Sequence, residues 1–237
     1  MIRLISAALR HPTHRTLGEF RRYWSHSHAP LCAQPPMVRR FVLDLTLDDA
    51  YDDELAPSFD GAAMYWFDDL DSLARHTTHP ESVALWTTVI ADDAQLFDRE
   101  QTWPTDHRRA TVVGTEQVVM DGAIAPDMIK AIFISSRRPG LTIEEFSMRL
   151  GSAHGALVTR LPGIRRYVQT HALPAAYGLT GLLAPTHDAC SELWFDSFHA
   201  WKAAVGSREW SAVVDSGEKL FARPSAYLIA HDQVLKE

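Results

Sequence analysis

The stretch TLGEFRRYWSHSH, residues 16–28, decides the fold because a second stretch, TIEEFSMRLGSAH, residues 142–154, repeats its pattern. Each begins with a threonine followed three residues later by a glutamate, the capping box that starts a helix. Each then carries a phenylalanine and ends on a histidine, so His28 corresponds to His154. The separation of the two histidines is the length of a small domain, so the chain contains one module twice.

The repeat extends outward from this helix in both directions. Met1-Ile2-Arg3 corresponds to Met128-Ile129-Lys130, Arg39-Arg40-Phe41-Val42 to Arg165-Arg166-Tyr167-Val168, and Trp66-Phe67-Asp68 to Trp194-Phe195-Asp196. Alternating apolar residues and turn signals predict the order strand, helix, strand, strand, helix, strand in each copy. We therefore expect an α+β fold of two ferredoxin-like modules, residues 1–119 and 128–237, packed sheet to sheet as an intramolecular pseudo-dimer.

Composition excludes several classes of protein. The formal net charge is −7 and no basic stripe occurs, which argues against a nucleic-acid partner. No stretch approaches the roughly 20 apolar residues of a membrane span. The only two cysteines, Cys32 and Cys190, fall at non-equivalent points of the repeat. A structural disulfide is not expected, and a reducing cytoplasm is the simplest location.

The motifs of the two copies resemble one known family. The first copy carries Glu19-Phe20, Tyr23-Trp24, His28-Ala29-Pro30-Leu31, Arg39-Arg40-Phe41, and Asp60-Gly61 before Trp66-Phe67-Asp68-Asp69. This pattern resembles the EthD domain, of the dimeric α+β barrel superfamily. The second copy keeps Glu145-Phe146, His154, Leu157, Arg165-Arg166-Tyr167 and Trp194-Phe195-Asp196, but has Leu150 for Trp24 and Ala156 for Pro30.

The resemblance implies a pocket between sheet and helices that works without a bound metal or flavin. Relatives of this kind include polyketide cyclases, decarboxylases, cofactor-independent monooxygenases and accessory proteins of xenobiotic oxidation. Fold alone does not decide among these activities.

The two histidines are the first candidates for catalysis. An imidazole with a pKa near 6.5 exchanges a proton at cellular pH, which suits enolisation, ring closure, dehydration or decarboxylation. His28 and His154 are therefore predicted to act as general acid–base groups. The alternative is that each one bonds a backbone carbonyl at the end of its helix. His79 is a further candidate for lining a pocket.

Aromatic and charged residues complete the predicted site. Flat aromatic walls suit planar ligands, and the candidates are Tyr23, Trp24, Trp66 and Trp194, for which core packing is the alternative. Arg40 and Arg166 could hold a substrate carboxylate or phenolate.

Glu192 stands out because the matching residue of the first copy is Met64. We expect it to have a raised pKa or a partner: either His154, as an orienting carboxylate, or Arg165 or Arg166 in a salt bridge.

Residues 173–185 form an apolar counterpart to an acidic loop after residue 47. An apolar loop of this kind is expected to cover a pocket as a lid or to lie in an oligomer contact.

The favoured function is a cofactor-independent enzyme of lyase or cyclase type acting on an aromatic or polyketide-like small molecule. The alternatives are a cofactor-independent monooxygenase and a non-catalytic protein that binds a hydrophobic metabolite. No metal site and no cofactor are expected, since the histidine spacings are weak and no glycine-rich phosphate loop occurs. A homodimer of the tandem chain is an open expectation.

Overall fold

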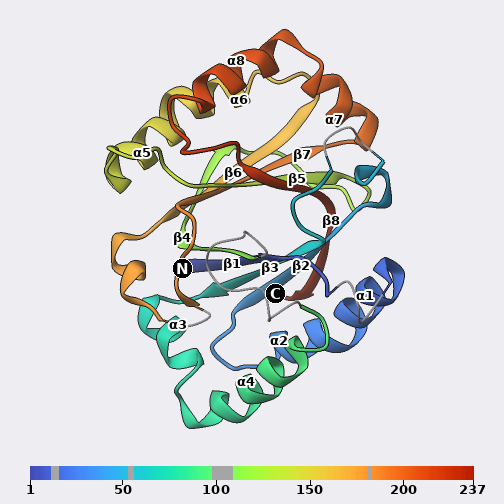
Figure 1. Cartoon of the computed structure of the whole chain (residues 1–237), viewed down its shortest axis with the longest axis vertical. Coiled ribbons are helices and arrows are strands. Elements are labelled where there is room, and N and C mark those ends of the chain that lie inside the picture. The colour runs from blue at the N-terminus through green and yellow to red at the C-terminus, as the bar shows by residue number, and fades with distance from the viewer. Residues whose placement is uncertain (12–15, 53–55, 98–108, 181–182) are drawn as a thin grey trace.

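The computed structural model describes residues 1–11, 16–52, 56–97, 109–180 and 183–237. Its eight strands form one closed barrel in the order β1-β3-β2-β8-β5-β7-β6-β4, and every neighbouring pair is antiparallel. Helices cover the barrel on two opposite sides, and the chain ends lie between them (Figure 1). The predicted α+β class with two ferredoxin-like modules packed sheet to sheet is confirmed.

The first module supplies one helical layer and four strands. Its helical stretches include a π-helical turn, η1, between α1 and α2. The elements in chain order are β1 (Ile2–Ala8), α1 (Leu17–Tyr23), η1 (Trp24–His28), α2 (Ala29–Ala33), β2 (Arg40–Thr46), η2 (Asp48–Ala50), β3 (Gly61–Phe67), α3 (Leu70–His76), α4 (Pro80–Asp93) and β4 (Arg109–Met120).

The second module repeats this order. A π-helical turn, η3, again separates the two parts of the first helix. The elements are β5 (Ile129–Ser135), α5 (Ile143–Arg149), η3 (Leu150–His154), α6 (Gly155–Val158), β6 (Ile164–Ala172), η4 (Pro174–Gly178), β7 (Ala189–Phe195), α7 (Phe198–Val205), α8 (Arg208–Gly217) and β8 (Ala226–Lys236).

The sequence explains where the first helix of each module starts. Thr16 and Glu19 form a capping box at α1, and Thr142 and Glu145 form the same box at α5. In each box the threonine hydroxyl accepts from the glutamate N–H, and the glutamate carboxylate accepts from the threonine N–H. Because α1 and α5 begin at equivalent residues, His28 and His154 also occupy equivalent positions, as the last residues of η1 and η3.

The last strand of each module joins the two sheets. The first half of β4 pairs with β1 and its second half pairs with β6; β8 likewise pairs with both β5 and β2. The barrel is therefore closed within one chain. The division into 1–119 and 128–237 stays a prediction, since both crossing strands belong to two sheets at once.

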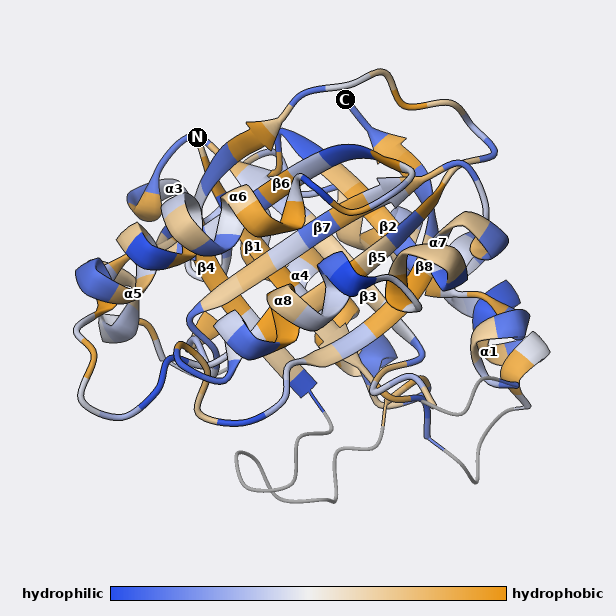
Figure 2. Ribbon diagram, turned by 90° about the horizontal axis from the view of Figure 1, so that it is seen from above, coloured by the Kyte–Doolittle hydropathy of each residue, from blue (hydrophilic) through white to orange (hydrophobic). Residues whose placement is uncertain are grey.

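Alternation along the strands separates two environments. One set of side chains points into the barrel, and the other points toward the helices; hydrophobic residues, orange in Figure 2, run along the strands. The apolar part of the barrel interior includes Ile5, Val42, Ile132 and Leu228. Separate hydrophobic clusters lie under the helices of each module.

The two modules also exchange loops. Ala176 and Leu183, from the apolar segment 173–185, are buried in the helix-side cluster of the first module. Ala50 of the first module is buried in the helix-side cluster of the second. The described part of the apolar segment thus packs against the other module of its own chain, which explains its composition without an oligomer; residues 181 and 182 lie outside the described residues.

Within the described ranges, no helix combines the length and the apolar character that crossing a membrane requires.

Candidate functional site

His28 and His154 occupy equivalent positions in the two modules, but their rings differ in charge. Both rings are buried beneath helices, with His28 2% and His154 5% exposed. Each ring packs edge-on against a phenylalanine, Phe97 for His28 and Phe221 for His154, at centroid distances of 5.8 and 5.5 Å. The difference between the sites comes from the polar partners of each ring.

His28 is held between two aspartates from the end of α4. Its Nδ1 lies 2.8 Å from Asp92 Oδ2, and its Nε2 lies 3.1 Å from Asp93 Oδ1 and 3.3 Å from Cys32 Sγ. Burial alone would lower the pKa of His28, but the hydrogen bonds to Asp93 and Cys32 outweigh it and raise the pKa to about 11. The ring is therefore an imidazolium at neutral pH, and both of its nitrogens are engaged.

His154 has neither carboxylate. Its Nδ1 lies 3.2 Å from the hydroxyl Oγ of Ser216, and its Nε2 has no hydrogen-bond partner among the described residues. Burial lowers the pKa of His154 to about 4, so its imidazole is neutral at neutral pH. A neutral imidazole whose Nε2 has no partner among the described residues is chemically able to accept a proton.

One dipeptide accounts for this difference. Trp86 in α4 corresponds to Trp210 in α8, and the same spacing then aligns Asp92-Asp93 with Ser216-Gly217. Gly217 lies directly beside the histidine ring, since a Cβ built on it would be 3.9 Å from His154 Cε1. The sequence repeat could have revealed this difference, because aligning the two copies on Trp86 and Trp210 sets Asp92-Asp93 against Ser216-Gly217.

Below the helices of the second module, one row of side chains crosses the sheet. The backbone register places Tyr227, Phe133, Ser191, Gln169 and Gln117 side by side on β8, β5, β7, β6 and β4. We call this row the second-module floor. Its β8–β5 half is aromatic: the rings of Tyr227 and Phe133 stack with centroids 6.0 Å apart. Its β6–β4 half is made of amides.

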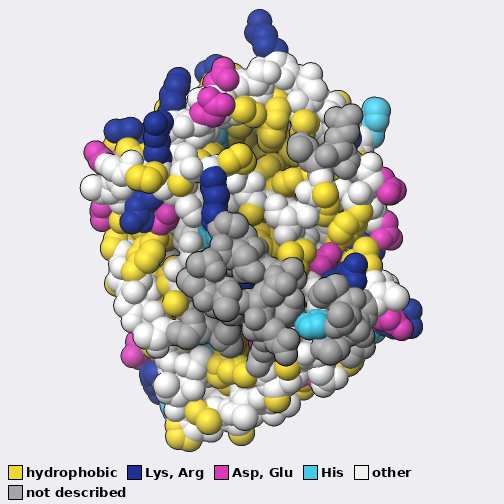
Figure 3. Space-filling view, viewed as in Figure 1, with side chains coloured by type: hydrophobic (Ala, Val, Ile, Leu, Met, Phe, Trp, Pro, Cys, Tyr) yellow, Lys and Arg dark blue, Asp and Glu magenta, His cyan; other side chains and the backbone are white. Residues whose placement is uncertain are grey.

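Two indoles cover the aromatic half of the second-module floor. Trp201 and Trp210 lie with their ring centroids 5.8 and 5.9 Å from that of Phe133. Hydrophobic side chains also gather on the upper part of the face drawn in Figure 3, over the second module. The first module has Ser6 and Thr111 where Phe133 and Tyr227 stand, so this aromatic wall belongs to the second copy alone.

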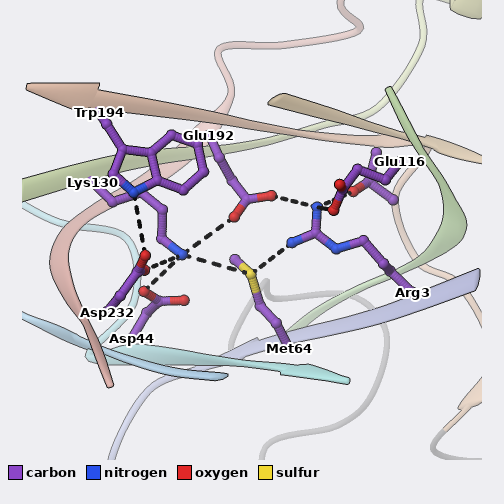
Figure 4. A network of polar contacts seen from close by, with 9 residues as sticks. Arg3, Asp44, Met64, Glu116, Lys130, Glu192, Trp194 and Asp232 are labelled. Carbon is purple, nitrogen blue, oxygen red and sulfur yellow. Dashed lines mark hydrogen bonds and ion pairs between the residues drawn. The ribbon is translucent and has the colours of Figure 1, made fainter. Parts of the chain in front are cut away.

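Glu192 does not pair with His154, Arg165 or Arg166. It points into the barrel, away from the helices, with its Oε1 2.6 Å from Arg3 Nη1 and its Oε2 3.2 Å from Lys130 Nζ (Figure 4). Burial alone would raise the pKa of Glu192, but the two cations outweigh it and hold the pKa below its usual value. Glu192 therefore has charged partners, as expected, but the predicted partners His154, Arg165 and Arg166 are wrong. The reason is that the Glu192 side chain and the helices lie on opposite faces of β7.

The predicted arginines and strand tryptophans also lie at the barrel rather than at the histidines. Trp66 contacts both Arg3 and Arg40, whose guanidinium carbons lie 4.5 and 4.8 Å from its ring centroid. Trp194 likewise contacts Lys130 and Arg166, whose Nζ and guanidinium carbon lie 5.2 and 5.9 Å from its ring centroid, and Arg166 also pairs with Asp121. These four predicted ligand-binding residues are thus not brought together with His28 or His154.

The remaining predicted residues lie in the first module. Trp24 is buried against Phe20 and Phe97, at centroid distances of 5.2 and 5.0 Å, so it is a core residue. The hydroxyl of Tyr23 donates to Asp92, which adds to the enclosure of His28. His79 caps α4 by accepting from the Glu81 N–H and is not beside either histidine site.

Comparison with known proteins identifies the module. The family model described as the EthD domain matches residues 13–100 and again 138–225, which together are well over half of the chain. The chain belongs to the EthD domain family. No curated protein matches it.

Two solved structures share the fold of this EthD protein across nearly its whole length. An anthrone oxidase-like protein is 15% identical with a TM-score of 0.61, over 100% of this chain and 93% of that one. A proposed monooxygenase from Fusobacterium nucleatum is 10% identical with a TM-score of 0.53, over 99% and 92%. Identities this low establish similarity of fold.

Proposed function

We propose that this protein is a small-molecule enzyme whose second module removes a proton from an aromatic or polyketide-like substrate, with His154 as the general base. The observation that carries the proposal is the neutral imidazole of His154, oriented by Ser216 and open at Nε2. A base of this kind must be unprotonated at working pH and within reach of an acidic proton. The aromatic residues of the second module, Phe133 and Tyr227 with Trp201 and Trp210 over them, support a planar ligand rather than an aliphatic one.

The anion formed in that step can react in two ways. In a lyase or cyclase reaction an enolate either expels hydroxide, which takes the proton back from His154 and leaves as water, or adds to a carbonyl and closes a ring. A substrate carboxylate instead loses carbon dioxide, and the carbanion that remains takes the proton back from His154. In an oxygenase reaction the anion is oxidised by dioxygen, so that a methylene group becomes a carbonyl and one molecule of water is released. The names of the two similar structures, anthrone oxidase-like and monooxygenase, support the second fate, and neither fate requires a resident cofactor for the proton transfer itself.

His28 has a different role in this proposal. Its ring is charged and bonded on both sides, so it offers no lone pair for a proton. We assign it to holding η1 against the end of α4, which leaves one working base in each chain.

The test is turnover of anthrone, followed by oxygen uptake and by the quinone absorbance, in the full chain. His154→Gln is expected to lower kcat by about 10²- to 10⁴-fold, the usual contribution of a positioned general base. His28→Gln is the matched control in the other copy and is expected to keep most of the rate in the folded protein. Undiminished turnover in His154→Gln contradicts the proposal. Product without oxygen uptake on a related carbonyl substrate supports the lyase or cyclase fate instead.

A further inference from the structure

On and beside the amide half of the second-module floor lie buried polar atoms that have no partner among the described residues. Gln169 is fully buried, and its Oε1 bonds to nothing among the described residues, although its Nε2 donates to Leu150 O at 3.0 Å. His171, the next residue on the same face of β6, has both ring nitrogens buried, and neither bonds to any residue in the part of the chain that the structure describes. Since Leu150 O can only accept, it fixes the Gln169 amide with Oε1 as the unbonded atom.

Such atoms are costly in a folded protein. A buried donor or acceptor without a partner costs about 1–3 kcal/mol, and most native examples are explained by a bound water or ligand. Gln169 Oε1 and the two ring nitrogens of His171 are three such atoms on adjacent positions of one strand face, so their unfavourable free energies fall in one small region. Burial also lowers the pKa of His171, so its ring is neutral and offers one donor and one acceptor.

The fold itself does not require these side chains. The first module has Leu43 where Gln169 stands and Leu45 where His171 stands, in the same strand register. Those leucines pack into the helix-side cluster of the first module. The second copy therefore carries polar groups at positions that leucine fills well.

The polar pair lies under the same helix turn as the proposed base. The Nε2 of Gln169 bonds to the carbonyl of Leu150, the first residue of η3, and His154 is its last. His171 lies opposite Ala189, which packs with Leu150, Phe146 and Phe221 in one cluster. Phe221 is the ring against which His154 packs.

We propose that Gln169 and His171 are specificity-determining residues that bind the oxygen-bearing edge of an aromatic ligand in the second module. Gln169 Oε1 accepts a hydrogen bond from a ligand hydroxyl, and His171 donates one to a ligand carbonyl or accepts one from a second hydroxyl. The unsubstituted part of the ligand lies toward Phe133 and Tyr227. This inference rests on the proposed function for the location of the site and adds the substrate class: hydroxylated or keto-substituted aromatics rather than bare hydrocarbons.

The experiment compares two probes of one shape, 1,8-dihydroxynaphthalene and naphthalene, by calorimetric titration of the full chain. The wild-type protein is expected to bind the dihydroxy probe at least tenfold more tightly. His171→Leu, which installs the residue of the first copy, is expected to remove about tenfold of that preference, the size of one lost hydrogen bond of 1.4 kcal/mol. It should leave naphthalene affinity within twofold. His199→Gln, on the exposed surface of α7, is the control and should change neither value.

Thermal unfolding separates recognition from packing. If His171 serves a ligand, His171→Leu has an equal or higher Tm, because an unbonded imidazole is replaced by an apolar side chain. A lower Tm with equal weakening of both probes overturns the inference, as does a wild-type protein without preference. Preference for the dihydroxy probe without turnover of anthrone would leave this inference standing and contradict the proposed enzyme. Turnover that needs His154 but is unchanged in His171→Leu would support the proposed enzyme and contradict this inference.

Discussion

The charge of each buried histidine follows from the two residues that end the helix above it. Asp92 and Asp93 make the His28 ring a cation, whereas Ser216 and Gly217 leave the His154 ring neutral. The pKa values of about 11 and about 4 lie on opposite sides of the ordinary value near 6.5. The two copies of the imidazole thus differ: His28 is bonded at both nitrogens, whereas the Nε2 of His154 has no partner among the described residues.

The stability of the protein should depend on His28 in alkaline solution. Its folded pKa is above its unfolded pKa, so its stabilising effect is complete below about pH 6.5 and is lost as pH rises toward about 11. From pH 7 to pH 9.5 the wild-type free energy of unfolding should fall by roughly 1 to 3 kcal/mol more than that of His28→Gln. Urea unfolding at the two pH values measures this. Parallel losses in the two proteins would show that the ring is not charged.

At the scale of elements, β4 depends on one glycine. Gly114 is the residue at which β4 passes from β1 to β6, and it pairs with both Arg3 and Ala172. A Cβ at this position would lie 2.0 Å from the carbonyl oxygen of His171, which is backbone and cannot move alone. The crossing strand therefore needs a residue without a side chain.

Gly114→Ala should accordingly destabilise the whole barrel. We expect a loss of about 2 kcal/mol or more, since the added methyl forces β4 and β6 apart. Gly178→Ala is the matched control, because nothing lies within 4 Å of a Cβ at that exposed position; it should change the free energy of unfolding by less than about 0.5 kcal/mol. Equal midpoints of the two variants in urea would mean that the crossing is looser than its contacts indicate.

Local patterns predicted the elements well, but not which side of the sheet each residue faces. The capping boxes at Thr16 and Thr142 and the alternation of β2 are short-range signals, and the structure confirms them. Alternation along β7 shows only that Glu192 shares a face with Trp194, which left His154, Arg165 and Arg166 as its expected partners. Which face lies in the barrel depends on strand pairing between the modules, which a single sequence does not contain.

Gln169 and His171 could not be predicted as site residues from the sequence for a related reason. Both lie in a strand that the sequence predicts, and their polarity against Leu43 and Leu45 was visible in the repeat. Their lack of partners is a property of the packed structure, and no spacing reveals it.

At the scale of the whole molecule, a network of ion pairs joins the two modules through the barrel. The first module contributes the buried Arg3 and Asp44 and the exposed Glu116, and the second contributes the buried Lys130 and Glu192 and the half-buried Asp232 (Figure 4). Burial, with Asp232 nearby, raises the pKa of Asp44 well above its usual range, whereas Asp232 is held ionised by Lys130. Glu192 is the carboxylate that contacts the cation of each module, and Met64 takes its place in the other copy.

Glu192→Gln should therefore weaken the junction of the modules more than any exposed ion pair does. It leaves two buried cations with one fewer counter-charge, a change that typically costs about 3 kcal/mol or more. Asp68→Asn removes the exposed partner of Arg39 at 2.6 Å and should cost less than about 1 kcal/mol.

The pH dependence of that effect has a definite sign. Because the folded pKa of Glu192 lies below its unfolded value, its contribution is present at neutral pH and is lost on acidification. The stability difference between wild type and Glu192→Gln should thus shrink as pH falls below about 4.5. If Glu192→Gln costs no more than Asp68→Asn at pH 7, the modules are held together by strand pairing and apolar contacts alone, and the charges in the barrel are incidental to their union.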